Sequence, residues 1–202
     1  KGAGQRIVDF VEQTAIPTAM LSMLQALPDT ALWHRLIKED RMLIQGADIN
    51  QATLTNFIPT RPIEEITREF IEAFWQLYDP MRLLNRTYRH FLMLAEGQRQ
   101  HYQGRSTSAG TPDVNWTMVR ALGIVCWRQG VVRKTRFRFW LNLFDMLRRY
   151  PEAAANYVGV CAQAEHFIDF RETVRAQIEA QLEAFLVQQQ QKQAQEQLPL
   201  AS

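Results

Sequence analysis

Few side chains in this sequence have the spacing of a metal site. The two cysteines, Cys126 and Cys161, lie far apart, and neither has a second Cys or a His at ligand spacing. Zinc and iron–sulfur sites need closely spaced thiolates or imidazoles, so the sequence predicts neither of them, nor a disulfide scaffold. His166 and Asp169 share a helix face, but two ligands make an incomplete site. We therefore predict buried thiols, no metal ligands and no catalytic residues in this chain.

Motifs for nucleotide binding and hydrolysis are missing from the sequence as well. It contains no Walker loop, no G-x-G-x-x-G, no G-x-S-x-G and no H-E-x-x-H. Glu64 and Glu65 cannot share a proton, because adjacent residues on a helix point about 100° apart. They instead favour the positive end of a helix dipole.

A basic, aromatic segment between residues 128 and 149 is the one charge anomaly. It holds seven basic residues against Asp145, a net charge of +6, whereas residues 150–202 carry a net charge of −4. Such a segment can pair with the acidic final helix, lie on an anionic membrane or bind nucleic acid. We favour the intramolecular pairing, expect no nucleic-acid binding, and expect no vesicle binding by the isolated chain. The candidate surface-binding residues are Arg133, Lys134, Arg136 and Arg138.

Length and composition indicate a folded protein of ordinary domain size. The chain has 202 residues, 47% of them hydrophobic and 22% charged, and a formal charge of +2, which excludes a disordered chain and a polycation. No apolar run reaches the roughly 18 residues of a membrane-spanning helix, and no signal peptide is recognisable, so we expect a cytoplasmic protein. The sequence opens at Lys1 without Met and runs directly into an amphipathic pattern, which we interpret as a fragment of a longer chain.

Residues 1–60 read as a short α/β segment. The hydrophobic pattern predicts a helix over 7–14, and the apolar run Thr18–Leu24 has the length of a buried parallel strand, although length alone does not separate strand from helix. Thr30 is an N-cap candidate for a second helix with an apolar face at Leu32, Trp33, Leu36 and Ile37. A further extended piece is expected over 54–58.

Every periodic segment of residues 61–187 reads as a helix, and a flexible loop is expected over residues 98–111. Asp79-Pro80 ends one helix and opens the next, and Tyr150-Pro151 ends a helix expected over 131–150. Its periodicity places the apolar face at Phe137, Trp140, Leu141, Phe144 and Leu147. We predict one helical core that contains Phe74, Leu84, Phe91, Phe137, Trp140, Phe144 and Phe185. Residues 188–202 are Gln-rich and predict a frayed helix end or disorder. The predicted fold is mainly α: a bundle-like helical domain preceded by a short α/β segment.

Four short stretches together resemble the C-terminal part of cobalamin-binding radical SAM proteins. They are Ile16-Pro17 with Ala19-Met20, the run Leu24–Trp33, Asn56–Pro59 and Leu77–Pro80. The pairs Phe139-Trp140, Tyr150-Pro151 and His166-Phe167 are similar to the same region, with less specificity. The sequence departs from the family at Asp29, where relatives commonly carry Gly.

The resemblance implies the end of a partial α/β barrel followed by a helical extension. Family members bind a [4Fe-4S] cluster through a CxxxCxxC motif, use S-adenosylmethionine, and often use cobalamin to methylate or rearrange an unactivated carbon. Because that motif is missing here, the resemblance implies that the cluster, the barrel and the cobalamin domain lie upstream. It also places Gln25 and Ala26 near bound S-adenosylmethionine.

Two functions follow as hypotheses. The first is a C-terminal cap or substrate-recognition domain of a radical SAM enzyme, inactive alone, acting on an unidentified small molecule or lipid. The alternative is a non-catalytic helical module that binds a protein or an anionic membrane surface through residues 128–149.

Overall fold

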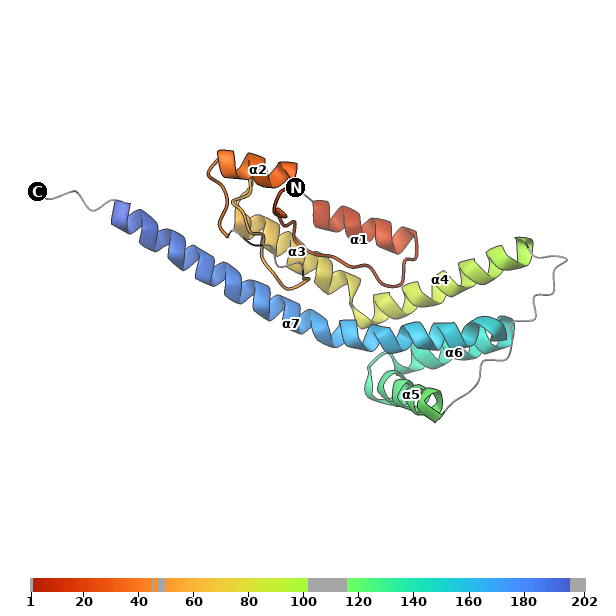
Figure 1. Cartoon of the computed structure of the whole chain (residues 1–202). Helices are drawn as coiled ribbons and strands as arrows, with labels where there is room; N and C mark the ends of the chain where they lie inside the picture. Colours follow the sequence, from red (N-terminus) through yellow and green to blue (C-terminus); the bar gives the residue numbers. More distant parts are fainter. Residues whose placement is uncertain (1, 45, 47–49, 102–115, 197–202) are drawn as a thin grey trace, which may run out of the picture. The chain divides into compact units, whose positions relative to one another are not determined.

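The protein is mainly helical, as predicted (Figure 1). The structure is a computed structural model that describes residues 2–44, 46, 50–101 and 116–196. Over these residues no strand is formed, and Met42 and Phe57 make an isolated antiparallel bridge. The helices are α1 (Ala3–Gln13), α2 (Ala31–Lys38), α3 (Ile63–Leu77), α4 (Pro80–His101), α5 (Trp116–Trp127), a π-helical turn η1 (Arg128–Val132), α6 (Arg136–Arg149) and α7 (Pro151–Glu196).

Two helix starts that the sequence marks, at Thr30 and at Asp79, are confirmed. Thr30 caps α2, because its Oγ1 accepts a hydrogen bond from the Trp33 amide at 3.2 Å. Asp79 precedes Pro80, the first residue of α4, and its Oδ1 accepts from the amides of Met81 and Arg82 at 3.0 Å each.

The turn before α2 explains the departure at Asp29. The φ angle of Asp29 is 62°, in the left-handed region that glycine adopts without strain. Asp is among the few other residues that this region tolerates, so the backbone of the turn accepts either residue.

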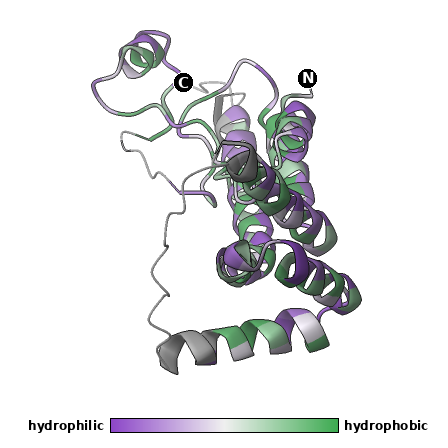
Figure 2. Cartoon of the chain, turned by 90° about the vertical axis from the view of Figure 1, so that its right-hand side faces the viewer, coloured by the Kyte–Doolittle hydropathy of each residue, from purple (hydrophilic) through white to green (hydrophobic). Residues whose placement is uncertain are grey.

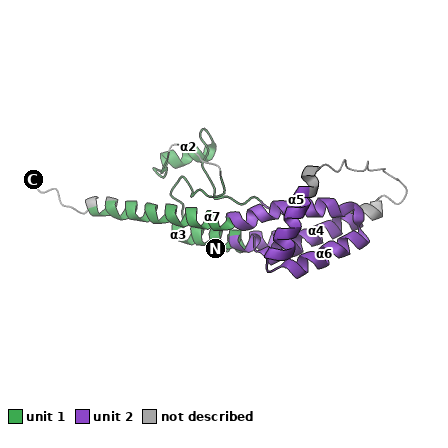
Figure 3. Ribbon diagram, turned by 90° about the horizontal axis from the view of Figure 1, so that it is seen from below, with its two compact units in different colours: residues 1–5, 20–74, 171–202 green, residues 6–19, 75–170 purple. Residues whose placement is uncertain are grey.

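The chain forms two compact units, each assembled from separate stretches of sequence (Figure 3). Unit 1 comprises residues 1–5, 20–74 and 171–202, and unit 2 comprises residues 6–19 and 75–170. The boundaries expected at residues 60 and 187 stay predictions. The Gln-rich segment is helical as far as Glu196, the end of α7, and the rest of the expected tail, residues 197–202, lies outside the described residues.

The strand expected over Thr18–Leu24 is not formed. A strand needs a paired neighbour, and the described residues provide none for this segment. Side chains bind the backbone here instead: the Tyr78 hydroxyl donates to the Ala19 carbonyl, and Gln25 and Ala26 just beyond are bonded to the loop at residues 54–56. The segment therefore stays extended without belonging to a sheet.

Unit 2 contains a fully buried arginine. The guanidinium of Arg86 donates from Nε to the Ile16 carbonyl at 2.8 Å, and from Nη2 to the carbonyls of Leu77 at 2.8 Å and Pro17 at 3.2 Å. Its Nη1 donates to the Glu12 carboxylate at 2.7 Å. Burial lowers the pKa of Arg86, and the hydrogen bond to Glu12 opposes this effect. One side chain thus joins α1, the segment that follows it and the end of α3.

The hydrophobic core of unit 2 lies around α4, α6 and the first part of α7. Its buried residues are Leu84, Phe91, Ala95, Val125, Phe139, Leu143, Met146, Tyr150, Ala154, Tyr157 and Cys161. The prediction for α6 is wrong: the buried face carries Phe139, Leu143 and Met146, while Phe137 is 72% and Phe144 62% exposed. The buried face also follows helical spacing, at Phe139, Asn142, Leu143 and Met146. Because it contains the polar Asn142, it looks less apolar in the sequence than the predicted face.

The start of α6 also differs from the prediction. The chain passes through η1 before α6 begins at Arg136, whereas the sequence pattern predicted a helix from residue 131. Trp140 packs against η1 and donates to the Gly130 carbonyl at 2.9 Å. A Cβ on Gly130 would lie 2.8 Å from the indole ring, so this turn requires glycine.

The single core expected from the sequence is also wrong, because Phe74 and Phe185 lie in stretches of unit 1. There Ala26, Trp33, Leu36 and Phe57 form a buried cluster. Gly4 of α1 lies so close to α3 that a Cβ would meet the Glu69 carbonyl at 2.6 Å. The Glu69 side chain accepts from Arg61 Nη2 at 2.7 Å and from the Gly2 amide at 3.1 Å.

Replacing Arg86 tests its role in unit 2. We expect Arg86→Met to lower the free energy of unfolding by about 3–5 kcal/mol, because three carbonyls and a carboxylate lose a buried charged donor. Arg89→Met is the matched control, since Arg89 bonds the same Glu12 from an exposed position and should cost less than about 1 kcal/mol. Urea denaturation measures both values, and equal losses would contradict the assignment.

Acid titration tests the Glu69 contacts. The hydrogen bonds from Arg61 and then Gly2 lower the pKa of Glu69 from 4.5 to about 2. Because the folded-state pKa is depressed, these contacts stabilise the fold fully above pH 4.5, and the stabilisation is lost as the pH falls towards about 2. The melting temperature of Glu69→Gln should therefore fall less steeply than that of the wild type over this range. Identical slopes would show that the contacts do not form in solution.

Candidate functional site

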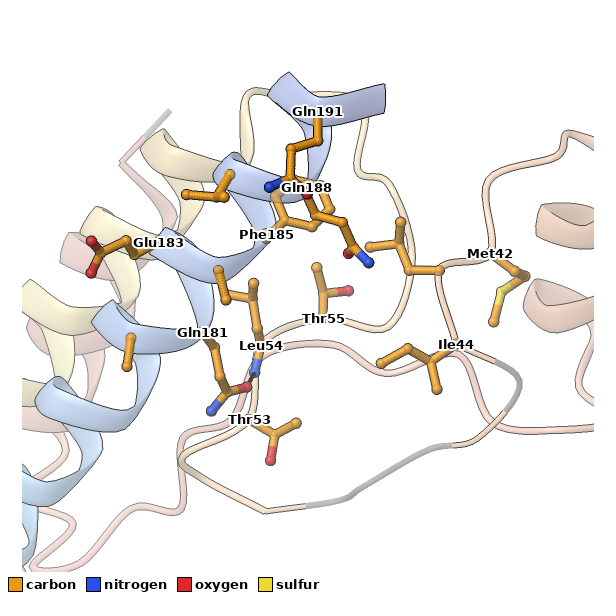
Figure 4. A pocket seen from close by; sticks show the side chains of 14 residues that line it. Met42, Ile44, Thr53, Leu54, Thr55, Gln181, Glu183, Phe185, Gln188 and Gln191 are labelled. Carbon is orange, nitrogen blue, oxygen red and sulfur yellow. Dashed lines mark hydrogen bonds between the residues drawn. The ribbon is translucent and has the colours of Figure 1, made fainter. Parts of the chain in front are cut away.

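A groove in unit 1 is the candidate functional site (Figure 4). One wall is the C-terminal part of α7, and the opposite wall is formed by residues 42–44 and 53–55. The groove has a volume of about 830 Å³. Its lining residues are Met42, Leu43, Ile44, Thr53, Leu54, Thr55, Ala180, Gln181, Glu183, Ala184, Phe185, Val187, Gln188 and Gln191.

Two glutamine side chains position the wall at Leu54. Gln181 of α7 accepts from the Leu54 amide at 2.9 Å and donates to the Ala52 carbonyl at 2.7 Å. Gln25 donates to the Leu54 carbonyl at 2.7 Å. These side-chain amides supply the donors and acceptors that a neighbouring strand would offer, so an irregular segment is fixed against a helix.

The wall at residues 42–44 is held by backbone pairing. The Leu43 amide donates to the Asn56 carbonyl at 3.0 Å, and the Ile58 amide donates to the Arg41 carbonyl at 2.8 Å. The guanidinium of Arg41 donates to the Ile58 carbonyl from Nε and Nη2, and to Glu39 at 2.6 Å from Nη1. Residues 56–58 therefore connect the two segments of the wall opposite α7, residues 42–44 and 53–55.

Eight of the fourteen lining residues are apolar, and six are polar, among them Glu183. Met42, Ile44, Leu54 and Phe185 supply hydrocarbon and aromatic surface. Thr55 is buried, its hydroxyl oxygen has no hydrogen-bond partner among the described residues, and its side chain points into the groove (Figure 4). A buried hydroxyl without a partner costs free energy, which a bound polar group would recover. The groove suits an apolar molecule that carries at least one hydrogen-bonding group.

Gln25 and Ala26 lie behind this groove wall. Ala26 is fully buried, and its amide and carbonyl are bonded to the side chain of Asn56 at 2.8 and 2.9 Å. The structure thus brings both residues to the segment that lines the groove, with the Ala26 backbone already engaged. Their role near S-adenosylmethionine stays a prediction.

The four surface candidates divide into one paired arginine and three residues without a carboxylate partner in the described part of the chain. Arg133 bonds Glu165 at 3.0 Å and Asp169 at 2.6 Å, so the expected pairing with the final helix is confirmed for this residue. Arg128 reinforces the pair from η1. Burial raises the pKa of Asp169, but the hydrogen bonds from both arginines outweigh this effect and hold it below its usual range.

The other three candidates have different surroundings. Arg138 donates to Asn85 Oδ1 at 2.8 Å, and the Arg136 guanidinium lies 5.1 Å from the centre of the Phe137 ring. Lys134 is exposed.

An iron–sulfur cluster does not fit the described residues. Cys161 is buried, and burial raises its pKa to about 12, which opposes thiolate formation. No group of three or more His, Cys, Asp and Glu side chains in the described part of the chain could hold a metal ion. Asp169 is engaged by arginines, and the ring of its sequence partner His166 stacks on Phe170.

In the part of the chain that the structure describes, no helix is long and apolar enough to cross a membrane.

Sequence reasoning missed the groove but contained a signal for it. Val174, Ile178, Gln181 and Phe185 follow helical spacing on α7, with a polar residue among apolar ones. A glutamine in such a stripe needs a polar partner when it packs. The identity of that partner, a backbone segment more than a hundred residues away, is not encoded locally.

Comparisons with known proteins identify related sequences. A family model described as "Domain of unknown function (DUF4070)" matches residues 30–180. The chain is 51% identical to "Uncharacterized methyltransferase sll1242" from Synechocystis over 197 aligned residues, and the alignment covers 97% of this chain and 35% of that protein. It is 28% identical to "Hopanoid C-2 methylase" from Rhodopseudomonas palustris over 178 aligned residues, and that alignment covers 88% of this chain and 32% of that protein. The chain therefore spans about a third of the length of both relatives. No solved structure matches it.

Replacing Gln181 tests how the groove wall is held. Gln181→Leu leaves the Ala52 carbonyl and the Leu54 amide without their partners, and we expect it to lower the free energy of unfolding by about 1–3 kcal/mol. Hydrogen exchange at the Leu54 amide should accelerate in this variant. Gln188→Leu, in the same groove, is the control and should cost less than about 0.5 kcal/mol. Unchanged exchange at Leu54 in Gln181→Leu would contradict the arrangement.

Proposed function

The chain belongs to the family described as domain of unknown function DUF4070, and from this membership we propose that it is the C-terminal region of a radical SAM enzyme that methylates an apolar substrate. The observation that carries the proposal is the 51% identity, along 97% of the chain, to a protein named as a methyltransferase. A second relative is named as a hopanoid C-2 methylase. Both names denote methyl transfer, and the apolar lining of the groove favours an apolar substrate.

In this proposal the chain recognises the substrate and does not generate radicals. The proposal assigns the iron–sulfur cluster to another part of the enzyme, because no group of three or more His, Cys, Asp and Glu side chains in the described part of this chain could hold a metal ion. S-adenosylmethionine, and cobalamin where it is used, would supply the methyl group and the radical chemistry. What the chain contributes is an apolar groove that excludes water and a threonine hydroxyl that orients the substrate.

The segment Thr18–Leu24 is proposed as the contact with the barrel of the same enzyme. It is extended without belonging to a sheet, and its side chains alternate: Met23 is buried, while Met20 is 87% and Leu24 65% exposed. Alternation of this kind is typical of a strand with one face still uncovered. A parallel neighbour from the barrel would pair with the backbone, a layer packed on the sheet would cover the exposed side chains, and Gln25 and Ala26 would then lie at the carboxyl end of that strand.

Blocking the groove tests the proposed function. Ala184→Trp fills the groove from α7, and we expect it to lower kcat/KM for methyl transfer at least tenfold in the complete enzyme, with a hopanoid as the first test substrate. Thr55→Val keeps the side-chain shape, removes the hydroxyl, and should raise KM by about tenfold. Methyl transfer from labelled S-adenosylmethionine is the measurement.

Ala176→Trp is the matched control for Ala184→Trp. It adds the same side chain to an exposed position of the same helix that does not line the groove, and should leave both kinetic constants unchanged. Equal kinetics of Ala184→Trp and the wild type would exclude the groove as the substrate site. A cluster-loaded enzyme that consumes no S-adenosylmethionine would contradict the reaction class itself.

A further inference from the structure

Unit 2 exposes a second apolar face that its core does not use. On α6 the exposed side chains are Phe137 at 72%, Leu141 at 64% and Phe144 at 62%. The chain that precedes α6 also exposes apolar side chains. They are Leu122, Ile124 and Trp127 of α5, and Val131 and Val132 of η1. In Figure 2 the part of α5 beyond its grey first turns is coloured mainly as hydrophobic. Scattered surface hydrophobes need no explanation, but a periodic stripe of large side chains marks an interaction site.

Cationic side chains border this stripe. At about 100° per residue, Phe137, Leu141 and Phe144 share one face, Arg136 and Arg138 fall on its two sides, and Arg148 lies on it about one turn after Phe144. Lys134 precedes the helix and is exposed. Within the described residues none of these four cations has a carboxylate partner.

Three acidic side chains close to this segment, Asp145, Glu165 and Asp169, are engaged elsewhere. Asp145 accepts from Tyr88 and pairs with Arg149 at 2.9 Å. Glu165 and Asp169 pair with Arg128 and Arg133. The charge that borders the stripe is therefore positive.

We propose that α6 binds an anionic membrane surface, lying in the plane of the interface. Phenylalanine and leucine on one face with Arg and Lys at its borders is the composition of an interfacial helix. The apolar stripe would enter the headgroup–acyl boundary, while Arg136, beside the Phe137 ring, and its neighbours reach lipid phosphates. This reverses the expectation of no vesicle binding, which went with pairing of the whole basic segment to the final helix.

The proposal rests on unit 2 alone and is independent of the proposed function. The groove variants of unit 1 leave α6 unchanged, and the α6 variants leave the groove unchanged. A failure of one proposal can therefore be told apart from a failure of the other.

Vesicle co-sedimentation tests the proposal. We expect the chain to sediment with vesicles of equal parts phosphatidylglycerol and phosphatidylcholine at about 0.15 M salt, and to be released as the salt is raised. The triple variant Lys134→Glu, Arg136→Glu, Arg148→Glu should bind roughly 100-fold more weakly, since each lost Lys or Arg weakens binding about fivefold. Arg138 is left intact because it bonds Asn85.

The apolar contribution has its own variant. Phe137→Ser with Leu141→Ser should weaken vesicle binding at least tenfold while net charge stays the same. Both side chains are exposed, so the fold is retained, and circular dichroism melting confirms it. The matched controls are Phe10→Ser with Met93→Ser, two exposed apolar residues elsewhere, and Lys38→Glu, Arg68→Glu, Arg82→Glu, which change the net charge by the same amount.

Four outcomes would overturn the proposal. They are absence of vesicle binding by the folded wild-type chain, equal binding to neutral phosphatidylcholine vesicles, equal loss of binding in the control variants, and a dimer in solution that Phe137→Ser dissociates. The last result would assign the stripe to a second copy of the chain. Salt-sensitive binding lost in both α6 variants and kept in both controls supports the membrane.

Discussion

The buried guanidinium of Arg86 is the contact on which the organisation of unit 2 depends. It binds carbonyls of Ile16, Pro17 and Leu77, all at points where the chain leaves a helix. Buried carbonyls at such points need donors, and the planar fork of an arginine supplies several from one side chain. The positive charge is tolerated because Glu12 compensates it at 2.7 Å. These polar contacts of Arg86 therefore fix the ends of α1 and α3, in addition to any apolar packing.

The residues that carry the family resemblance have a structural explanation of the same kind. Ile16, Pro17 and Leu77 accept from Arg86, and Tyr78 donates to Ala19. In unit 1, Asn56 satisfies both backbone groups of Ala26. Where the resemblance implied a strand of a sheet, guanidinium, phenol and amide groups bind the backbone. These residues of the motifs therefore fix irregular segments of the backbone.

What could be predicted from the sequence was the part determined by neighbouring residues. The N-caps at Thr30 and Asp79 follow from local hydrogen bonding, and both are confirmed. The buried face of α6 could not be chosen locally, because two stripes at helical spacing were available and long-range packing selected the one with Asn142. The groove was missed for the same reason: Gln181 meets Ala52 and Leu54, whose positions depend on the tertiary fold. Gln25 and Ala26 contact Leu54 and Asn56, and their place near S-adenosylmethionine stays a prediction.

The exposed apolar face of α6 links the fold to the membrane proposal. If Phe137, Leu141 and Phe144 were buried, the cations around them would border no exposed apolar surface, and pairing with α7 would account for the charge of the whole basic segment. Instead, in the described part of the chain α7 neutralises Arg128 and Arg133, Asp145 pairs with Arg149, and the other cations of the segment border exposed hydrocarbon. A lipid-like substrate partitions into the bilayer, where its concentration is far higher than in water. An enzyme domain with an apolar groove and an interfacial helix would meet such a substrate at the surface where it accumulates, so the two independent proposals lead to the same class of substrate.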